Sequence, residues 1–301
     1  MKRMFFLDEM ILIRFFMLLI VSSIILHLDA QTKRALVIGL GQQEDISWNK
    51  INGDKDIIFV TEMLRRVGYG KRNVITLVNE KATKQRIVSS FKELAKLCKY
   101  GDIVYVHFSG HGQRVTDVNG DEGDGWDESW IPYDAYRKYC IKDKGDKHLI
   151  DDELYQLLTD IKTKIGEKGR MLVVVDACHG GDSSCGLTTL VDQNEKQELG
   201  VEITTRGVSD PFVLPNRKKT RNIKGKEQWL TLSACKSFQA NQELNNPQVG
   251  ILSYALYLTS KRGRVEMHNI EDFISKNKGP YPQTPILVGE TEKYNISDVL
   301  K

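Results

Sequence analysis

Short apolar runs alternate with amphipathic stretches along the chain from residue 33 onward. Runs with the length and composition of buried strands lie at 35–40, 74–78, 103–108, 171–175, 229–233 and 284–288. Stretches with apolar residues at helical spacing lie at 54–67, 83–99, 151–161, 250–259 and 269–276. Continuous apolar strands that alternate with helices are typical of a parallel sheet covered on both faces. The pattern therefore predicts an α/β fold in which a mainly parallel six-stranded sheet lies between layers of helices.

Residues 1–30 have a different pattern. Lys2, Arg3 and Arg14 precede an almost wholly apolar stretch at 17–28, and polar residues resume at Gln31. That order is typical of a secretory signal peptide. We therefore expect residues 1–30 to export the protein to the periplasm or the medium, and residues 31–301 to form one domain. An uncleaved membrane anchor is the alternative, and only then would we expect contact with a membrane.

Composition excludes some functions. The 301 residues carry a formal net charge of +3 with both signs interspersed, which does not resemble the clustered basic face of a nucleic-acid-binding protein. We expect no nucleic-acid partner, no organic cofactor and a monomer. The cysteine spacing matches no paired zinc pattern, and a free thiol is expected because the count is odd; the cysteines are Cys98, Cys140, Cys178, Cys185 and Cys235.

Two predicted strands end in residues suited to nucleophilic catalysis. The run 171–175 leads into Cys178, and two glycines follow shortly after, which leaves room for backbone N–H groups near a developing oxyanion. The run 103–108 ends near His111 on a small-residue turn. An imidazole close to a thiol lowers the thiol pKa and can protonate a leaving amine. A cysteine after an apolar strand is more often a small buried side chain, so neither feature is decisive alone.

Two other histidines, His107 and His179, lie close to His111 or Cys178 in the sequence. His107 lies four residues earlier, and four strand residues span about 13 Å, too far for one shared metal ion. We expect His107 in the core and His111 exposed. His179 is a competing base, but it neighbours Cys178 on an extended segment and should point the other way.

The segments His-Phe-Ser-Gly-His-Gly (107–112) and Asp-Ala-Cys-His-Gly (176–180) together resemble the caspase-like superfamily, peptidase family C14 of clan CD, most closely the bacterial metacaspases. The resemblance extends over about 33–288. It implies a caspase-like fold and a cysteine endopeptidase in which His111 and Cys178 form a catalytic dyad. A catalytically weak interaction or regulatory module with this fold is the first alternative. A legumain- or gingipain-like enzyme is the second.

The resemblance also implies a binding pocket for the residue on the acyl side of the cut bond. Asp176 stands where caspases carry the glutamine of their aspartate-binding site. A carboxylate there would repel acidic side chains and attract arginine or lysine. Asp56 and Ser109 match two further pocket positions of the family. We therefore expect protein or peptide substrates with a basic residue at this position, although Asp176 could cap a turn, and Asp56 or Asp54 a helix.

An acidic stretch at 117–128 suggests calcium, which prefers carboxylate oxygens. Glu122 occupies the place of the EF-hand glycine, so the EF-hand is excluded. The metacaspase resemblance instead implies a calcium site that includes Asp127, Asp151 and Asp152, with Cys185 where the family has a fourth aspartate. The alternative is that Asp151 or Asp152 simply caps a helix.

A polar, basic stretch at 187–226 interrupts the pattern of strands and helices. Caspase-like proteins are cut in this region during maturation, so we expect that the enzyme can process itself after Arg206, Arg217 or Lys219. A charged, solvated loop is the alternative interpretation.

Overall fold

The computed structural model describes residues 31–120, 122–178, 204–208, 210–215, 227–237 and 239–301. The predicted signal peptide, His179 and Cys185 lie outside these ranges. The unit Lys33–Lys301 is considered by itself. In this described part, no helix is both long and apolar enough to cross a membrane.

A six-stranded sheet forms the centre of the unit, with strand order β11-β8-β7-β3-β1-β2. All neighbouring strands are parallel except β11, which pairs antiparallel with β8. The predicted α/β fold with a mainly parallel six-stranded sheet is therefore confirmed. The strands are β1 (Lys33–Gly39), β2 (Val74–Val78), β3 (Ile103–Ser109), β7 (Arg170–Asp176), β8 (Leu230–Ser233) and β11 (Ile286–Gly289).

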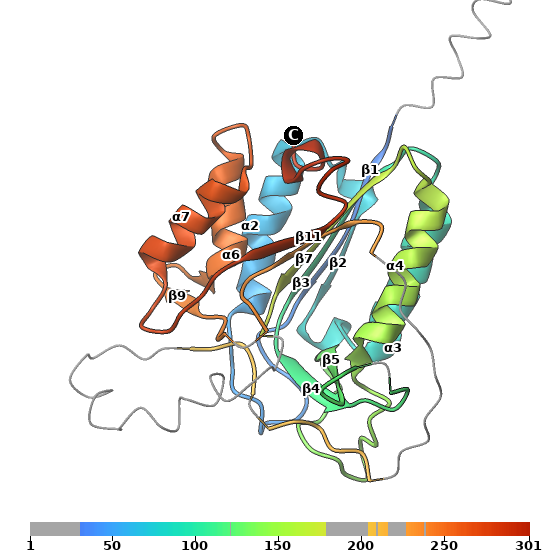
Figure 1. Cartoon of the computed structure of the whole chain (residues 1–301), viewed down its shortest axis with the longest axis vertical. Coiled ribbons are helices and arrows are strands. Elements are labelled where there is room, and N and C mark those ends of the chain that lie inside the picture. Colours follow the sequence, from blue (N-terminus) through green and yellow to red (C-terminus); the bar gives the residue numbers. More distant parts are fainter. Residues whose placement is uncertain (1–30, 121, 179–203, 209, 216–226, 238) are drawn as a thin grey trace, which may run out of the picture. The chain divides into compact units, whose positions relative to one another are not determined.

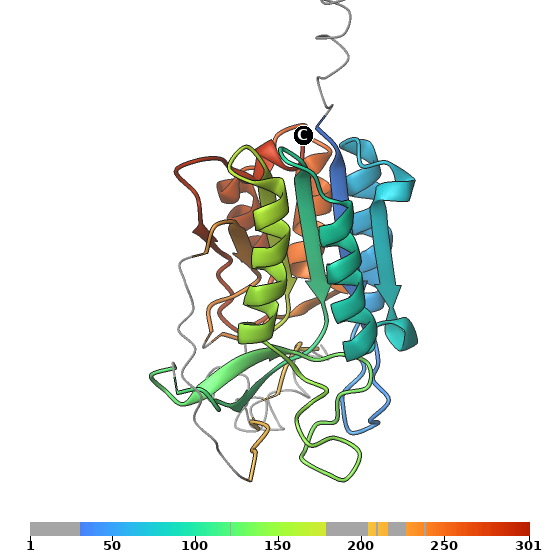
Figure 2. The same ribbon diagram turned by 90° about the vertical axis from the view of Figure 1, so that its right-hand side faces the viewer.

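Helices cover both faces of this sheet (Figure 1). One face carries α2 (Gly53–Arg66), α6 (Ile251–Ser260) and α7 (Met267–Asn277), and the other carries α3 (Lys84–Leu97) and α4 (Asp151–Ile165). Figure 2 shows α3 (teal) and α4 (lime) side by side along the strands. Each helix coincides with a predicted amphipathic stretch to within a few residues.

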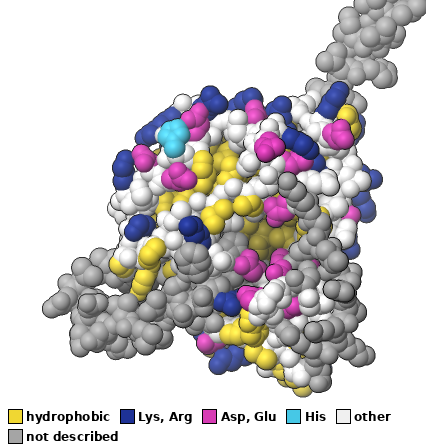
Figure 3. Space-filling model, in the orientation of Figure 1, with side chains coloured by type: hydrophobic (Ala, Val, Ile, Leu, Met, Phe, Trp, Pro, Cys, Tyr) yellow, Lys and Arg dark blue, Asp and Glu magenta, His cyan; other side chains and the backbone are white. Residues whose placement is uncertain are grey.

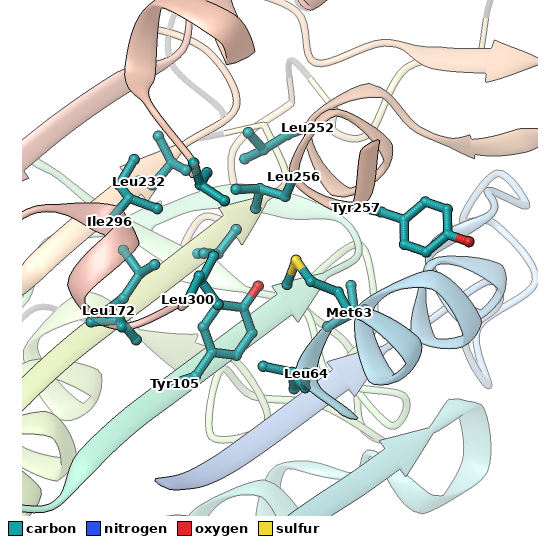
Figure 4. Packing of buried hydrophobic residues seen from close by; sticks show 14 of the residues in the cluster. Met63, Leu64, Tyr105, Leu172, Leu232, Leu252, Leu256, Tyr257, Ile296 and Leu300 are labelled. Carbon is teal, nitrogen blue, oxygen red and sulfur yellow. The ribbon is translucent and has the colours of Figure 1, made fainter. Parts of the chain in front are cut away.

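Two hydrophobic cores separate the sheet from its two helical layers. Successive strand side chains point to opposite faces, so Leu172 and Val174 of β7 pack with α2 and α6, whereas Val173 and Val175 pack with α3 and α4. Figure 4 shows the first core, where Met63 of α2 lies close to residues of α6 and of the strands. The dry packing on both faces fixes the strand ends that carry the site.

Two smaller β-structures were not predicted. A three-stranded antiparallel sheet consists of β4 (Gly112–Thr116), β5 (Trp126–Trp130) and β6 (Leu149–Ile150), and a hairpin consists of β9 (Glu243–Asn245) and β10 (Gln248–Gly250). Short 3-10 helices lie at Lys71–Asn73, Asn79–Lys81 and Ile296–Asp298. Both β-structures lie beyond the carboxyl ends of the central strands.

Candidate active site

The site is built where β3 and β7 end side by side. Their parallel register pairs Ser109 with Asp176 at the last residue of each strand. His111 and Cys178 each follow two residues later, so the sheet brings together the two residues that the sequence analysis paired. Just beyond, Gly112 at the start of β4 forms a parallel β-bridge with Gly207.

The His111 ring is held in one orientation. Its Nε2 lies 2.7 Å from the carbonyl oxygen of Asn49, and the ring stacks on Trp48 with centroids 5.0 Å apart. A carbonyl only accepts, so Nε2 carries the proton and Nδ1 is the basic nitrogen. Nδ1 is buried and has no hydrogen-bond partner among the described residues. The expectation that His111 is exposed is wrong: it is 1% exposed, because Trp48 covers the ring.

The histidine is neutral over most of the pH range. Burial lowers the pKa of His111 to about 4, although the hydrogen bond to Asn49 opposes the shift, and the positive charge of Arg206 lowers it further. A neutral imidazole with an available Nδ1 can accept a proton from a thiol. The ring is therefore in the protonation state of a general base.

The Cys178 backbone and side chain both make polar contacts. Its N–H donates to the carbonyl oxygen of Arg206 at 2.7 Å, and its Sγ accepts from the backbone N–H of Asn241 at 3.1 Å. Donors aimed at a carbonyl oxygen and at a sulfur would stabilise an oxyanion and a thiolate, respectively. This arrangement resembles a nucleophile with a peptide carbonyl bound beside it.

The bound peptide is the segment 204–208 of the same chain, which we call the inserted segment. The backbone N–H of Arg206 donates to the Asn241 carbonyl at 2.9 Å, and Arg206 is fully buried. A Cβ atom added to Gly207 would lie 2.4 Å from Cys178 Cβ and 3.1 Å from Sγ. The Arg206–Gly207 peptide bond thus lies against the thiol. The interpretation of this stretch as a solvated loop is wrong at Arg206, because its charge is neutralised inside the protein.

The Arg206 guanidinium occupies a buried pocket that contains the predicted residues. Its Nη1 lies 2.8 Å from Asp56 Oδ2 and 3.3 Å from Asp176 Oδ1, and it donates to Ser109 Oγ at 2.5 Å. A Cβ atom at residue 250 would lie 2.6 Å from Nη1, so Gly250 leaves the space that the guanidinium fills. The structure brings Asp56, Ser109 and Asp176 together around one cation.

Two pocket residues were missed by the sequence analysis. Glu243 accepts from Arg206 Nε at 2.8 Å, and the Asn241 side chain donates to Asp176 Oδ1 at 2.7 Å. Both lie at 239–243, far along the chain from the strand-end motifs and without a motif of their own. We call Asp56, Ser109, Asp176 and Glu243 the acidic pocket.

The two aspartates have opposite protonation tendencies. Burial raises the pKa of Asp56 to about 6; Arg206 opposes the rise and the negative charge of Asp176 adds to it. Burial also acts on Asp176, but Arg206 and hydrogen bonds from Asn241 and Ser253 hold the pKa of this carboxyl below its usual range. Ser253 lies in the first turn of α6 and donates through both N–H and Oγ. Asp176 is therefore the more readily ionised of the two aspartates.

The predicted calcium ligands lie on the small sheet and at the start of α4. Strands β5 and β6 pair Ser129 with Ile150, so Asp127 lies on the strand next to β6, and Asp151 and Asp152 are the first two residues of α4, which follows β6 directly. Asp152 accepts a hydrogen bond from Asn119 Nδ2, and Asp151 accepts from the Asp152 N–H at 3.0 Å. In the ranges that the structure describes, no three His, Cys, Asp or Glu side chains are grouped to hold a metal ion.

A second hollow lies beside Cys178 on the α4 side of the sheet. It has a volume of about 190 Å³, and its walls include the rings of Trp130, Tyr155 and Trp229, with acidic side chains such as Glu227 among them. Figure 3 shows hydrophobic side chains between acidic ones on this face. The acidic pocket differs from this hollow in that its carboxylates are in direct contact with a buried guanidinium.

Comparison with curated proteins finds metacaspases. Metacaspase-1A of Aspergillus oryzae is 29% identical over 160 residues, which is 50% of this chain and 35% of that protein. Metacaspase-1 of Schizosaccharomyces pombe is 26% identical over 263 residues, which is 74% of this chain and 58% of that protein. The chain thus spans only about a third to somewhat over half of the length of these relatives.

Solved structures agree on the fold. A protein of Geobacter sulfurreducens superposes with a TM-score of 0.59 at 24% identity, covering 85% of this chain and 92% of its own. Caspase-1 of Spodoptera frugiperda gives a TM-score of 0.53 at 14% identity, with 86% of each chain covered. The caspase-like fold expected from the sequence is confirmed.

The family model "Metacaspase, peptidase C14 domain" matches residues 33–184, which is about half of the chain. The protein therefore belongs to this metacaspase family.

Proposed function

We propose that the protein is a cysteine endopeptidase that cuts after arginine or lysine, with Cys178 as nucleophile and His111 as general base and acid. The observation that carries this proposal is the position of Arg206. Its side chain fills the acidic pocket while its carbonyl oxygen accepts from the Cys178 N–H at 2.7 Å. The inserted segment therefore lies as a substrate would.

The groups at the site suffice for acyl transfer. His111 Nδ1 takes the thiol proton, and the Cys178 sulfur forms a bond to the substrate carbonyl carbon. The Cys178 N–H stabilises the oxyanion that develops. Collapse breaks the C–N bond, the imidazolium gives its proton to the leaving amine, and water assisted by neutral His111 hydrolyses the thioester. The products are a free carboxylate and a free amine.

The pocket charge supports the basic preference. Three buried carboxylates, Asp56, Asp176 and Glu243, face one guanidinium. An aspartate side chain in their place would be a fourth negative charge in a dry site, which is strongly unfavourable. Cleavage after acidic residues is therefore not expected.

Fluorogenic peptides that differ only at the residue before the cut test this function. We expect the purified protein to hydrolyse peptides ending in arginine or lysine at least about 100-fold faster than one ending in aspartate, because the charge complementarity is reversed. Preferential hydrolysis of the aspartate peptide would contradict the pocket assignment. Absence of hydrolysis of the arginine, lysine and aspartate peptides would favour the alternative of a caspase-fold interaction module. Preferential hydrolysis of a fourth peptide, which ends in asparagine, would favour a legumain-like enzyme.

We further propose that the enzyme cuts its own chain between Arg206 and Gly207. Among the three predicted positions, Arg206 is the one whose side chain lies in the acidic pocket; Arg217 and Lys219 lie outside the described residues. The bond next to the thiol is thus already oriented for attack.

Intact mass measurement checks this self-processing. Wild type is expected to yield a fragment that begins at Gly207. Arg206→Gln keeps most of the side-chain length but removes the charge, so we expect this variant not to yield the fragment. Arg217→Gln serves as the matched control and should still yield the fragment. The same Gly207 fragment from Arg206→Gln would contradict the assignment of this bond.

We also propose that calcium activates the enzyme and that the protein is exported. Asp127, Asp151 and Asp152 would contribute oxygen ligands, and a ligand from outside the described residues would have to complete the set. The peptide assays repeated with calcium and with a chelator test this point separately from the dyad. Export is proposed from the sequence of residues 1–30, and a monomeric state is proposed with it.

A further inference from the structure

We propose that Glu243 makes this enzyme prefer arginine over lysine, and that Asn52 positions Glu243 for this role. The inference rests on the proposed function and specifies its substrate class. It concerns a residue that the strand-end motifs do not contain, on the β9 strand.

The protein binds the Arg206 guanidinium through two of its nitrogen atoms. Its terminal Nη1 contacts Asp56, Ser109 and Asp176, whereas its Nε contacts Glu243 Oε1 at 2.8 Å. These atoms lie at different distances from the backbone, because Nε is bonded to Cδ and Nη1 is at the end of the side chain. Both Arg206 and Glu243 are buried, with side-chain exposures of 0% and 1%. The Glu243 contact is therefore a charge-assisted hydrogen bond shielded from water.

Lysine cannot make both contacts. Its one ammonium lies at the end of the chain, and a methylene group, Cε, takes the place of Nε of arginine. An ammonium directed to Asp56 and Asp176 would leave Glu243 facing this methylene. A buried carboxylate that loses a charged donor is costly. Lysine thus retains the terminal contacts and loses the Glu243 contact.

Asn52 fixes the Glu243 carboxylate from the other side. Its backbone N–H donates to Glu243 Oε1 at 2.7 Å, and its Nδ2 donates to Oε2. Asn52 is the residue before α2, and its side chain makes no capping hydrogen bond to that helix. The side chain is thus available to orient Glu243, so that Oε1 points to the arginine Nε.

The test compares arginine and lysine peptides on wild type and Glu243→Gln. The variant keeps the size of the side chain but removes its charge. We expect kcat/KM for the arginine peptide to fall about 10- to 100-fold, the worth of one charged hydrogen bond. We expect kcat/KM for the lysine peptide to change less than about threefold, because lysine does not contact Glu243 on this geometry. Asn52→Ala should lower the arginine-to-lysine ratio in the same direction by a smaller factor.

Glu271→Gln on the exposed side of α7 is the matched control and should leave both rates unchanged. Equal losses for the two peptides in Glu243→Gln, or an unchanged ratio, would overturn the inference while leaving the proposed function intact. If wild type hydrolyses neither peptide, the proposed function itself fails. Should Glu243→Gln not fold, as judged by thermal unfolding, Asn52→Ala together with Glu243→Asp decides the question: an unchanged ratio in both overturns the inference.

Discussion

Replacing Cys178 by alanine is expected to lower kcat/KM for an arginine-ending peptide by at least about four orders of magnitude, as happens when a nucleophile that acts in a dyad or triad is removed. The alanine keeps the backbone N–H that would hold the oxyanion. The acidic pocket keeps its side chains, so peptide binding should persist when Cys178→Ala is combined with Arg206→Gln, which removes the competing arginine of the inserted segment. Steady-state hydrolysis and the affinity for a non-cleavable arginine peptide, measured on the same preparation, separate the two effects.

Cys98→Ala is the control for this experiment. Cys98 lies at the end of α3, away from the strand ends, and burial raises the pKa of its thiol to about 12, so it is unreactive at neutral pH. We expect near wild-type hydrolysis from this variant. Retained hydrolysis in Cys178→Ala would show that another residue is the nucleophile.

Replacing Asp176 by asparagine is expected to reduce kcat/KM for arginine and lysine peptides alike, by about 100- to 4,000-fold. Removing one partner of a buried ion pair typically costs about 3–5 kcal/mol, and each 1.4 kcal/mol is a factor of about ten. Asp176 is fully buried, and the pocket cation and hydrogen bonds from Asn241 and Ser253 keep it ionised. Asparagine can replace a hydrogen bond there but not the charge.

The equal loss for both peptides distinguishes Asp176 from Glu243, because a lysine ammonium would reach Asp176 but not the position of Glu243. Asp272→Asn is a suitable control, since Asp272 is exposed on α7 and pairs only with Lys276 in a salt bridge. Initial rates on both peptides check the prediction. A loss confined to the arginine peptide would mean that Asp176 does not carry the common charge of the pocket.

Most of the fold followed from the sequence because each central element has a strong local pattern. The buried strands are uninterrupted apolar runs, and the helices have clear amphipathic spacing. The dyad, Ser109 and Asp176 were predicted because the family motifs lie at the ends of β3 and β7, where the sheet itself brings them together. Asp56 was predicted from a separate match to the family, at the start of α2. Ser109 and Asp176 are in register, so their closeness needs no long loop.

The parts that could not be predicted depend on contacts between distant segments. Glu243 and Asn241 have no local signature, and their role follows only once β9 lies beside α2 and the inserted segment. Strands β4 and β5 lie on either side of a stretch dense in carboxylates, and this composition is typical of a loop. Their antiparallel pairing is seen only in the tertiary structure. His111 was expected on the surface because the sequence around it does not indicate that the distant Trp48 stacks on its ring.

The acidic pocket is occupied by Arg206 of the same polypeptide. A substrate from solution must therefore compete with this arginine for the pocket. A ligand that is part of the same chain as its binding site competes at an effective concentration that can reach the order of millimolar. A peptide from solution at micromolar concentration would therefore have to bind Asp56 and Asp176 far more tightly than Arg206 does in order to displace it. Cutting the Arg206–Gly207 bond removes one of the two tethers, so the inserted segment becomes a product that can leave. If the proposed self-processing occurs, the buried arginine delays the access of external substrates to the pocket until this bond has been cut.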